Sequence, residues 1–387
     1  MDPFTEADTV IQATRDTGAL REREATKKTI EETFPENQEV LVKFISQNLG
    51  YDGGKPVAAY VIYKCLIRWR SFEDKRTNIF NRIVQMIASA IEVPDNNEVL
   101  AYWLSNLATL FFLLRRMSTN ATTPVSGGFQ QKLIVFIERI YGMIRDNLEK
   151  EILPLLELCI QKPGTIEENT QPLVPHWLSI VESLNSYLNL MKANNVPPFL
   201  VSKIFTQVFS FINVQLFNSF LLRRECCSLS HGEYVEAGLA ELNKWCVEAT
   251  DEYAGLAWDE LRHIRQAVGF LVIREKPKMT LEEVTRELCP MLSILHLYRI
   301  STMYWDGKYG TWSVSSDFVT NMRAMIPEDW NPVTSPFLLD NDSSIPFTVE
   351  DMSKSMEQVD VNYSEAPPHL INDDFDQLLY SLGQKVA

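Results

Sequence analysis

The chain has 387 residues and a formal net charge of −15 at pH 7, and 45% of its residues are hydrophobic. This length predicts two or three folding units, and the apolar content is enough to form large cores, which excludes an intrinsically disordered protein. Residues 328–387 contain twelve acidic residues and two lysines, so most of the negative charge lies in the last sixth of the chain. This acidity argues against nucleic acid as a partner.

The cysteines indicate the redox compartment. None of the six forms a C-x-x-C pair, and all of them lie in apolar helical contexts. Thiols in this setting are expected to be buried and reduced, which predicts a cytoplasmic protein. No secretory signal peptide is expected, because Asp2, Glu6 and Asp8 occupy the place of its apolar run. The six positions are Cys65, Cys159, Cys226, Cys227, Cys246 and Cys289.

Apolar residues recur every three to four positions through the first half of the chain, which predicts helices. Residues 1–37 form a leader whose Glu-, Lys- and Arg-rich part, 18–34, fits the end of a longer helix or coiled coil. Pro154 should kink the longest predicted helix or restart it as a second one. The predicted helices of this half are 38–48, 55–72, 77–91, 98–117, 129–160 and 177–192.

Residues 203–228 form the stretch around which the rest of the chain is expected to pack. No charge occurs from Ile204 to Leu222, a length that would suit a membrane span. Polar side chains recur throughout it, however, and amides are costly in hydrocarbon without partners. Because its apolar residues also lie on several sides, we expect a helix buried inside a large protein, and no membrane span. The polar residues are Thr206, Gln207, Ser210, Asn213, Gln215, Asn218 and Ser219.

The helical pattern continues after Ser228, and no strand ladder or repeat of fixed period is found. The predicted fold class is therefore all-α. Residues 327–347 carry loop signals, and a short helix is expected over 348–358. The other helices predicted in this half are 232–248, 258–274, 280–288, 291–303 and 315–325.

The search for catalytic or metal-binding motifs is negative. Gly54-Lys55 and Gly307-Lys308 each resemble the end of a phosphate-binding loop, but neither has the remaining residues of that motif. Cys226, Cys227 and His231 come nearest to a metal cluster, yet a fourth ligand is missing, and buried thiols are the preferred interpretation. We therefore predict no catalytic residue, no cofactor and no metal site, and a chain that is not an enzyme.

Basic residues gather between positions 64 and 82. A solvent-exposed helix face with local acidic partners is the preferred interpretation. The alternative is a docking surface for an acidic segment, with Arg68 and Arg76 as candidate partner-binding residues. The six basic residues are Lys64, Arg68, Arg70, Lys75, Arg76 and Arg82.

The C-terminal end contains a candidate docking segment. Pro367 and Pro368 forbid a continuous helix, but residues 373–382 can form a short one with an acidic first turn. Its apolar residues, Phe375, Leu378, Leu379 and Leu382, fall on one face. A helix of about ten residues is marginal alone in water, so we expect it to dock on this chain or on a partner.

Five separated stretches resemble one family, the globular tail, or dilute domain, of class XI myosins, which are the plant relatives of class V myosins. The resemblance extends from about Gln38 to Asp360. The stretches are IYGMIRDNLEKEI (140–152), LFNSFLLRRECCS (216–228), DEYAGLAWDELRHIRQAVGFLV (251–272), YRISTMYWDGKYGT (298–311) and FLLDNDSSIPF (337–347).

This resemblance implies an elongated all-helical module of two packed subdomains that share a long central helix, crossed by a C-terminal extension. The corresponding divisions are a leader, 1–37; a first helical subdomain, 38–200; a second, 201–326; and an acidic extension, 327–387.

The resemblance also implies a function. Such a tail binds cargo through vesicle or organelle receptors and Rab GTPases, and in some members it folds back on the motor domain and inhibits it. The motor ATPase would lie outside this chain, and the full-length myosin would dimerise through an upstream coiled coil and reach actin tracks in the cytoplasm. A non-motor helical scaffold or tethering protein is the alternative.

One Rab-binding surface of the class V relatives can be carried over in part. Tyr234 matches a tyrosine of that surface, because Leu242 and Trp245 follow in register. The positions of its lysine and glutamine fall near Gly269 and Val272, which supply neither charge nor amide. Arg262 and Arg265 are added as candidate contacts to the carboxylates of a GTPase. Packing of Tyr234 inside its own pair of helices is an equally weighted alternative.

Overall fold

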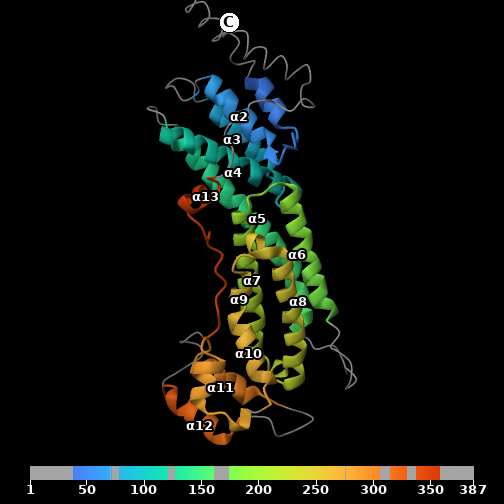
Figure 1. Ribbon diagram of the computed structural model, residues 1–387, viewed down its shortest axis with the longest axis vertical. Coiled ribbons are helices and arrows are strands. Elements are labelled where there is room, and N and C mark those ends of the chain that lie inside the picture. Colours follow the sequence, from blue (N-terminus) through green and yellow to red (C-terminus); the bar gives the residue numbers. More distant parts are fainter. Residues whose placement is uncertain are drawn as a thin grey trace, which may run out of the picture. The chain divides into compact units, whose positions relative to one another are not determined.

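The computed structural model describes residues 38–69, 71, 78–120, 127–160, 174–274, 276–305, 314–328 and 337–357, and these are predominantly helical (Figure 1). The predicted all-α class is confirmed. The strands within the described residues are β1 (Tyr51–Asp52) and β2 (Lys55–Pro56), an antiparallel pair. The predicted leader 1–37 and the predicted helix 373–382 lie outside the described residues.

The described residues divide into two compact units whose boundaries differ from the predicted ones. The first unit contains residues 38–93 and Asn106–Ile134, and the second contains Pro94–Ser105 and 135–357. The predicted boundary at residue 200 therefore does not separate the units. The helices that contribute to both are α4 (Asn97–Asn120) and α5 (Gly127–Ile160), whereas the expected shared helix lies within the second unit.

The first unit is built from a short helix at residues 38–45, α2 (Val57–Arg68), α3 (Asn78–Ala90) and its parts of α4 and α5. Its core is made of aliphatic and aromatic side chains, and Phe80 of α3 meets Phe129 of α5 with ring centroids 4.5 Å apart. Asn106 is buried in this core, and its side-chain oxygen accepts a 2.9 Å hydrogen bond from the Ala59 N–H. It thereby satisfies a free donor in the first turn of α2.

The second unit contains the remaining elements. Its central helix, α7, begins at Pro198, five positions before the predicted start, because Pro197 and Pro198 suit a helix N-terminus. The others are α6 (Pro175–Ala193), η1 (Arg224–Cys226), α8 (Leu229–Ala254), α9 (Ala257–Glu260), α10 (Arg262–Val272), η2 (Lys276–Lys278), η3 (Glu283–Leu288), α11 (Ile294–Met303), α12 (Ser316–Met325) and α13 (Val349–Ser355).

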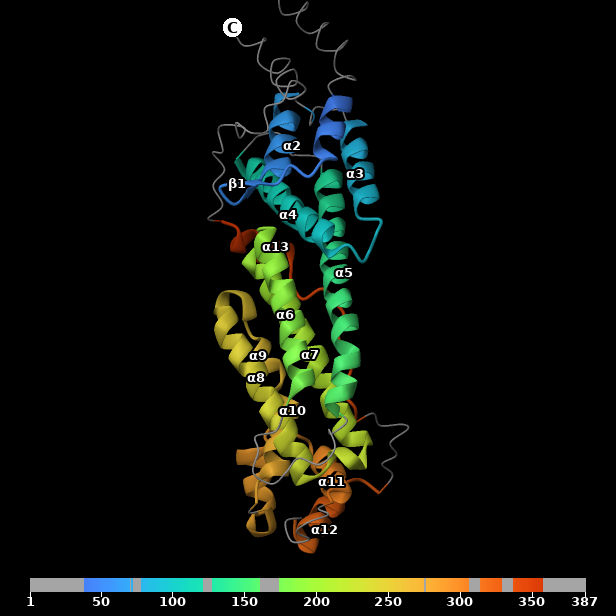
Figure 2. The same ribbon diagram turned by 90° about the vertical axis from the view of Figure 1, so that its right-hand side faces the viewer.

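The helix α7 (Pro198–Leu222) occupies the middle of the second unit, and it packs against α8, α9, α10, α11 and α13 (Figure 2). By length and composition, α7 and residues Asn97–Met117 could each cross a membrane, yet 67% and 83% of their most apolar windows are buried inside the protein. The expected core helix is therefore present. Its buried positions include Gln207 and Asn213, whose amides have protein partners.

Two local predictions differ from the structure. Pro154 lies inside α5, which continues to Ile160, so the helix does not restart there. The helix predicted over 258–274 is two helices separated at Leu261, and the Asn213 side chain of α7 accepts a 3.0 Å bond from Ile264 N–H in the first turn of α10. A long-range cap of this kind leaves no local sequence signal.

The contact between α6 and α8 generates a stability prediction. A Cβ at Gly238 of α8 would lie 2.1 Å from two ring carbons of the buried Trp177 of α6. Gly238→Ala should therefore lower the free energy of unfolding by about 1–3 kcal/mol through overpacking. Gly269 of α10 is the matched control, because a Cβ there meets no atom within 4 Å.

Gly269→Ala should leave stability unchanged or raise it by up to ~1 kcal/mol, since alanine favours helix more than glycine does. Denaturant unfolding of both variants checks this. Equal losses of stability at the two positions would contradict the packing described for Trp177.

Candidate docking sites

An extended segment, residues 337–347, lies on the helices of the second unit and is called the C-terminal strap. It has no regular secondary structure and connects to α13 (Figure 1). Asn218 of α7 binds Leu339 in both directions: its Nδ2 donates to the Leu339 carbonyl and its Oδ1 accepts from the Leu339 N–H, both at 2.9 Å. The α7 side chain therefore offers the strap the pair of bonds that a neighbouring strand would offer.

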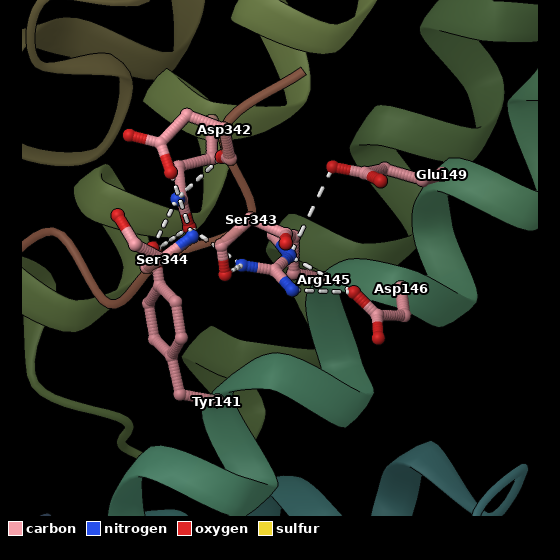
Figure 3. Close-up of polar contacts among 8 residues, drawn as sticks. Tyr141, Arg145, Asp146, Glu149, Asp342, Ser343 and Ser344 are labelled. Atoms are coloured by element: carbon pink, nitrogen blue, oxygen red, sulfur yellow. Dashed lines mark hydrogen bonds and ion pairs between the residues drawn. The ribbon is translucent and has the colours of Figure 1, made fainter. Parts of the chain in front are cut away.

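A second cluster holds the middle of the strap, and Figure 3 shows its side chains. Gln207 of α7 donates from Nε2 to the carbonyls of Asp342 and Ser344, at 3.2 and 2.7 Å. Its Oε1 accepts from the Tyr141 hydroxyl of α5 at 2.8 Å and from Arg145 Nη1 at 3.2 Å. The amide of Gln207 is thus fixed by α5 on one side and by the strap on the other.

Arg145 carries the charge of this cluster. Its side chain is 6% exposed, and Nη1 donates to the Ser343 carbonyl at 2.8 Å (Figure 3). Two further bonds, from Nε and Nη2, reach Asp146 Oδ1 at 2.9 and 2.7 Å. Glu149 is more distant, at 3.9 Å from Nε. The buried guanidinium is therefore neutralised mainly by Asp146, and its Nη1 binds both the strap and Gln207.

The two ends of the strap are anchored separately. At one end, the His296 ring of α11 contacts the Phe337 carbonyl through Nε2 at 2.7 Å, while Nδ1 accepts from the Ser293 N–H at 3.3 Å. This pairing requires the neutral tautomer with the proton on Nε2. At the other end, the Phe347 ring packs edge-on against Tyr141, with centroids 5.1 Å apart.

Burial raises the pKa of Glu149 to about 7, an effect that Arg145 opposes and Asp146 reinforces; a hydrogen bond with Asn341 also opposes it. Burial also lowers the pKa of His296, which keeps its ring neutral. The strap therefore lies beside a carboxyl group that changes protonation near neutral pH and a histidine ring that is neutral there.

Tyr234, the predicted GTPase contact, is buried within the second unit. Its side chain is 0% exposed, and burial raises the pKa of its hydroxyl to about 12. In this conformation Tyr234 offers no atom to a partner, which agrees with the alternative of a ring packed between helices. Sequence register located the residue correctly on α8 but did not show which way the helix faces.

The four predicted arginines have different outcomes. Arg262 is exposed on α10 and donates from Nε to the Asp259 carbonyl at 2.8 Å. Arg265 is half-buried, with its guanidinium 4.2 Å from the Trp258 ring centre. Both remain candidates for partner contacts, although Arg265 is already held by a cation–π interaction. The Arg68 side chain and Arg76 lie outside the described residues.

A shallow groove in the first unit was missed by the sequence analysis. It lies between residues 38–46 and α3, and its volume is about 530 Å³. We call it the α3 groove. The apolar stripes of both helices were recognised, but periodicity does not show where two helices fail to close against each other. Its lining residues are Val42, Ser46, Arg82, Gln85, Met86, Ser89 and Ala90.

No group of three His, Cys, Asp or Glu side chains in the described part of the chain is placed to hold a metal ion. All six cysteines are buried and free, as expected for reduced thiols. Burial raises the pKa of Cys226 and Cys227 to about 12, so both thiols stay protonated at neutral pH.

This arrangement of helices is found in solved globular tails of myosins. A structure described as "Myosin V cargo binding domain" covers 95% of this chain and 100% of its own, with a TM-score of 0.61 and 15% identity. The structure described as "Structure of Myo2-GTD in complex with Inp2" covers 93% and 99%, with a TM-score of 0.63 and 16% identity. These likenesses establish the fold.

Sequence similarity is more specific. The DIL domain family matches residues 203–308. Myosin-17 of Arabidopsis thaliana is 60% identical over 424 aligned residues, which cover 92% of this chain and 28% of that protein. Myosin-11 of the same plant is 54% identical, covering 88% and 26%. The chain belongs to the globular tails of class XI myosins, and it spans about a quarter of the length of these relatives.

The strap contacts generate a prediction for Arg145. Arg145→Met removes the bond to Ser343, and the loss of a charge-assisted hydrogen bond should speed protease cleavage within 337–347 about tenfold or more. Limited proteolysis with a protease specific for large apolar residues measures this at Phe337, Leu338 and Leu339. Arg139→Met, an exposed position on the same helix, is the matched control. Equal cleavage rates in the two variants would show that Arg145 does not hold the strap.

Glu149 generates a pH prediction. Its pKa is about 7 in the folded chain against 4.5 for the exposed group, so the folded chain retains a proton that the unfolded chain releases. The contribution of this group to stability is therefore present below pH 4.5 and declines as the pH rises towards 7. In Glu149→Gln the side chain at position 149 is uncharged at every pH, so this variant lacks the decline in stability.

As the pH rises from 5 to 8, the melting temperature of wild type should accordingly fall more than that of Glu149→Gln. Thermal unfolding of both proteins across this range measures the difference, and groups that titrate equally in both cancel. A constant offset between the two proteins at all pH values would refute the raised pKa.

Proposed function

We propose that this chain is a cargo-binding tail that attaches vesicles or organelles to a class XI myosin through receptor proteins. The observation that carries the proposal is the similarity over about nine-tenths of the chain to plant myosins. Solved tails of the same fold support it, since Myo2-GTD was determined in complexes with Mmr1, Smy1 and Inp2. The full-length myosin would supply the motor ATPase, the coiled coil and the movement along actin in the cytoplasm.

Rab GTPases and the motor domain are the finer partners that we propose. Because Tyr234 is buried, a Rab contact would rely on the exposed Arg262 and, in part, on Arg265. Both cations suit an acidic partner surface. Inhibition of the motor by a folded-back tail rests on the family resemblance alone.

A helical scaffold that joins tethering proteins is the competing function. It would also bind proteins, but it would have no motor to connect them to. The two functions therefore differ in the full-length protein, where only the first predicts that cargo moves along actin when the tail is engaged.

The test is binding of the purified chain to organelle membranes. The chain should co-sediment with intact membranes, and binding should fall at least tenfold on protease-treated membranes and on protein-free vesicles of the same lipids. Full binding to protein-free vesicles would mean direct lipid recognition and would overturn the receptor proposal. Absence of binding to intact membranes would also overturn the receptor proposal.

The Rab contact has its own measurement. Immobilised Rab GTPases loaded with a GTP analogue or with GDP are incubated with wild type and with Arg262→Glu. GTP-dependent binding that the charge reversal weakens about tenfold is expected, because rim charges act mainly through attraction to the opposite sign. Lys244→Glu, an exposed position on α8, is the control. Equal binding of all three proteins would remove Arg262 from the contact.

A further inference from the structure

The α3 groove has the chemistry of a site for an amphipathic helix. Val42, Met86 and Ala90 supply its apolar surface, and the side chains of Val42 and Met86 are half-buried. Ser46, Gln85 and Ser89 are exposed polar residues along it. Methionine adapts its shape to apolar partners, and the groove is shallow, with a volume of about 530 Å³.

Arg82 gives the groove a positive group. Its Nη2 lies 3.5 Å from Glu39 Oε1, and the two side chains are 29% and 74% exposed. An exposed pair of this length is weak, so the guanidinium can accept a second carboxylate without a large loss. The groove therefore combines an apolar surface with a cation suited to an acidic, amphipathic ligand.

The chain itself contains a ligand of this chemistry. Residues 373–382 read DDFDQLLYSL, with three aspartates in the first four positions. As a helix, this segment places Phe375, Leu378, Leu379 and Leu382 on one face. The aspartates at its N-terminus also favour the helix dipole. A helix this short needs a surface to be stable, which the α3 groove supplies.

The segment belongs to the same chain as the groove. Residues 358–372 join the last described residue to Asp373, and this length of chain reaches up to about 50 Å when extended. A tether that spans the distance gives an effective concentration on the order of millimolar, far above that of a free peptide. An occupant in the same chain therefore competes best against a second copy or a separate peptide.

We propose that residues 373–382 dock as a helix in the α3 groove of the same chain, with the apolar face on Val42 and Met86 and an aspartate near Arg82. The docking is internal to the chain and holds whether or not the chain binds cargo.

The test is hydrogen exchange of amides 375–382 in the full chain. In wild type these amides should exchange about tenfold or more slowly than a random coil. Met86→Glu and Ser89→Glu each place a carboxylate in the groove opposite an acidic segment, and each should abolish the protection. Met325→Glu, at an exposed methionine of α12, is the matched control and should retain it.

Variants of the segment test the same contact from the other side. Phe375→Ala combined with Leu379→Ala should abolish the protection, whereas Gln377→Ala combined with Tyr380→Ala, on the opposite helix face, should not. Melting temperatures of all variants identify any that fail to fold, and the segment variants leave the helical core untouched.

A photo-crosslinker at position 86 gives the location directly, and its product should join peptides of residues 373–382 within one chain. Random-coil exchange of amides 375–382 in wild type would overturn the proposal. Protection that persists in both groove variants, or that rises with protein concentration, would also overturn it, the latter by showing a second copy as the occupant.

Discussion

The second unit depends on the requirement that amide side chains buried in α7 find hydrogen-bonding partners. A buried amide without a partner costs about 1–3 kcal/mol, and α7 places Gln207 and Asn213 among aliphatic and aromatic side chains. Asn213 is satisfied by the first turn of α10, and Gln207 by α5 and by two carbonyls of the strap. The half-buried Asn218 binds the strap as well. Three of the polar residues that argue against a membrane span thus attach the neighbouring elements.

The strap is held mainly through its backbone, and this has consequences for its sequence. The described side chains contact carbonyl oxygens of Phe337, Leu339, Asp342, Ser343 and Ser344. Asp342, Ser343 and Ser344 are exposed, and these bonds use their carbonyl oxygens; the Asp342 side chain separately accepts a 2.9 Å bond from the Ser344 N–H. Phe347 and the neutral His296 add fixed points at the two ends. The strap is therefore attached by several hydrogen bonds to its backbone, and this attachment is sensitive to the charge state of the groups around it, Glu149 and His296.

The periodicity of apolar residues was sufficient to predict where the helices lie, but it was insufficient to predict which elements contact one another. The stripes at three-to-four spacing identified α2, α3, α4, α6 and α12 to within a few residues, and the polar content of α7 indicated a core helix. The split between α9 and α10 depends on Asn213, which is 51 positions away from Ile264. The hydrogen bonds that hold the strap likewise join residues more than a hundred positions apart. The burial of Tyr234 depends on the orientation of α8, and no local sequence pattern encodes that orientation. The α3 groove depends on the incomplete closure of two helices, which no local pattern encodes either.

The most direct test of this account is the exchange rate of the Leu339 amide. Its N–H donates to Asn218 Oδ1, a contact made by α7 with a strap that has no secondary structure of its own. The account predicts a protected Leu339 amide in wild type and exchange close to the random-coil rate in Asn218→Leu, with the global melting transition retained. Random-coil exchange of Leu339 in wild type, or unchanged protection in Asn218→Leu, would contradict the claim that the α7 amides hold the strap.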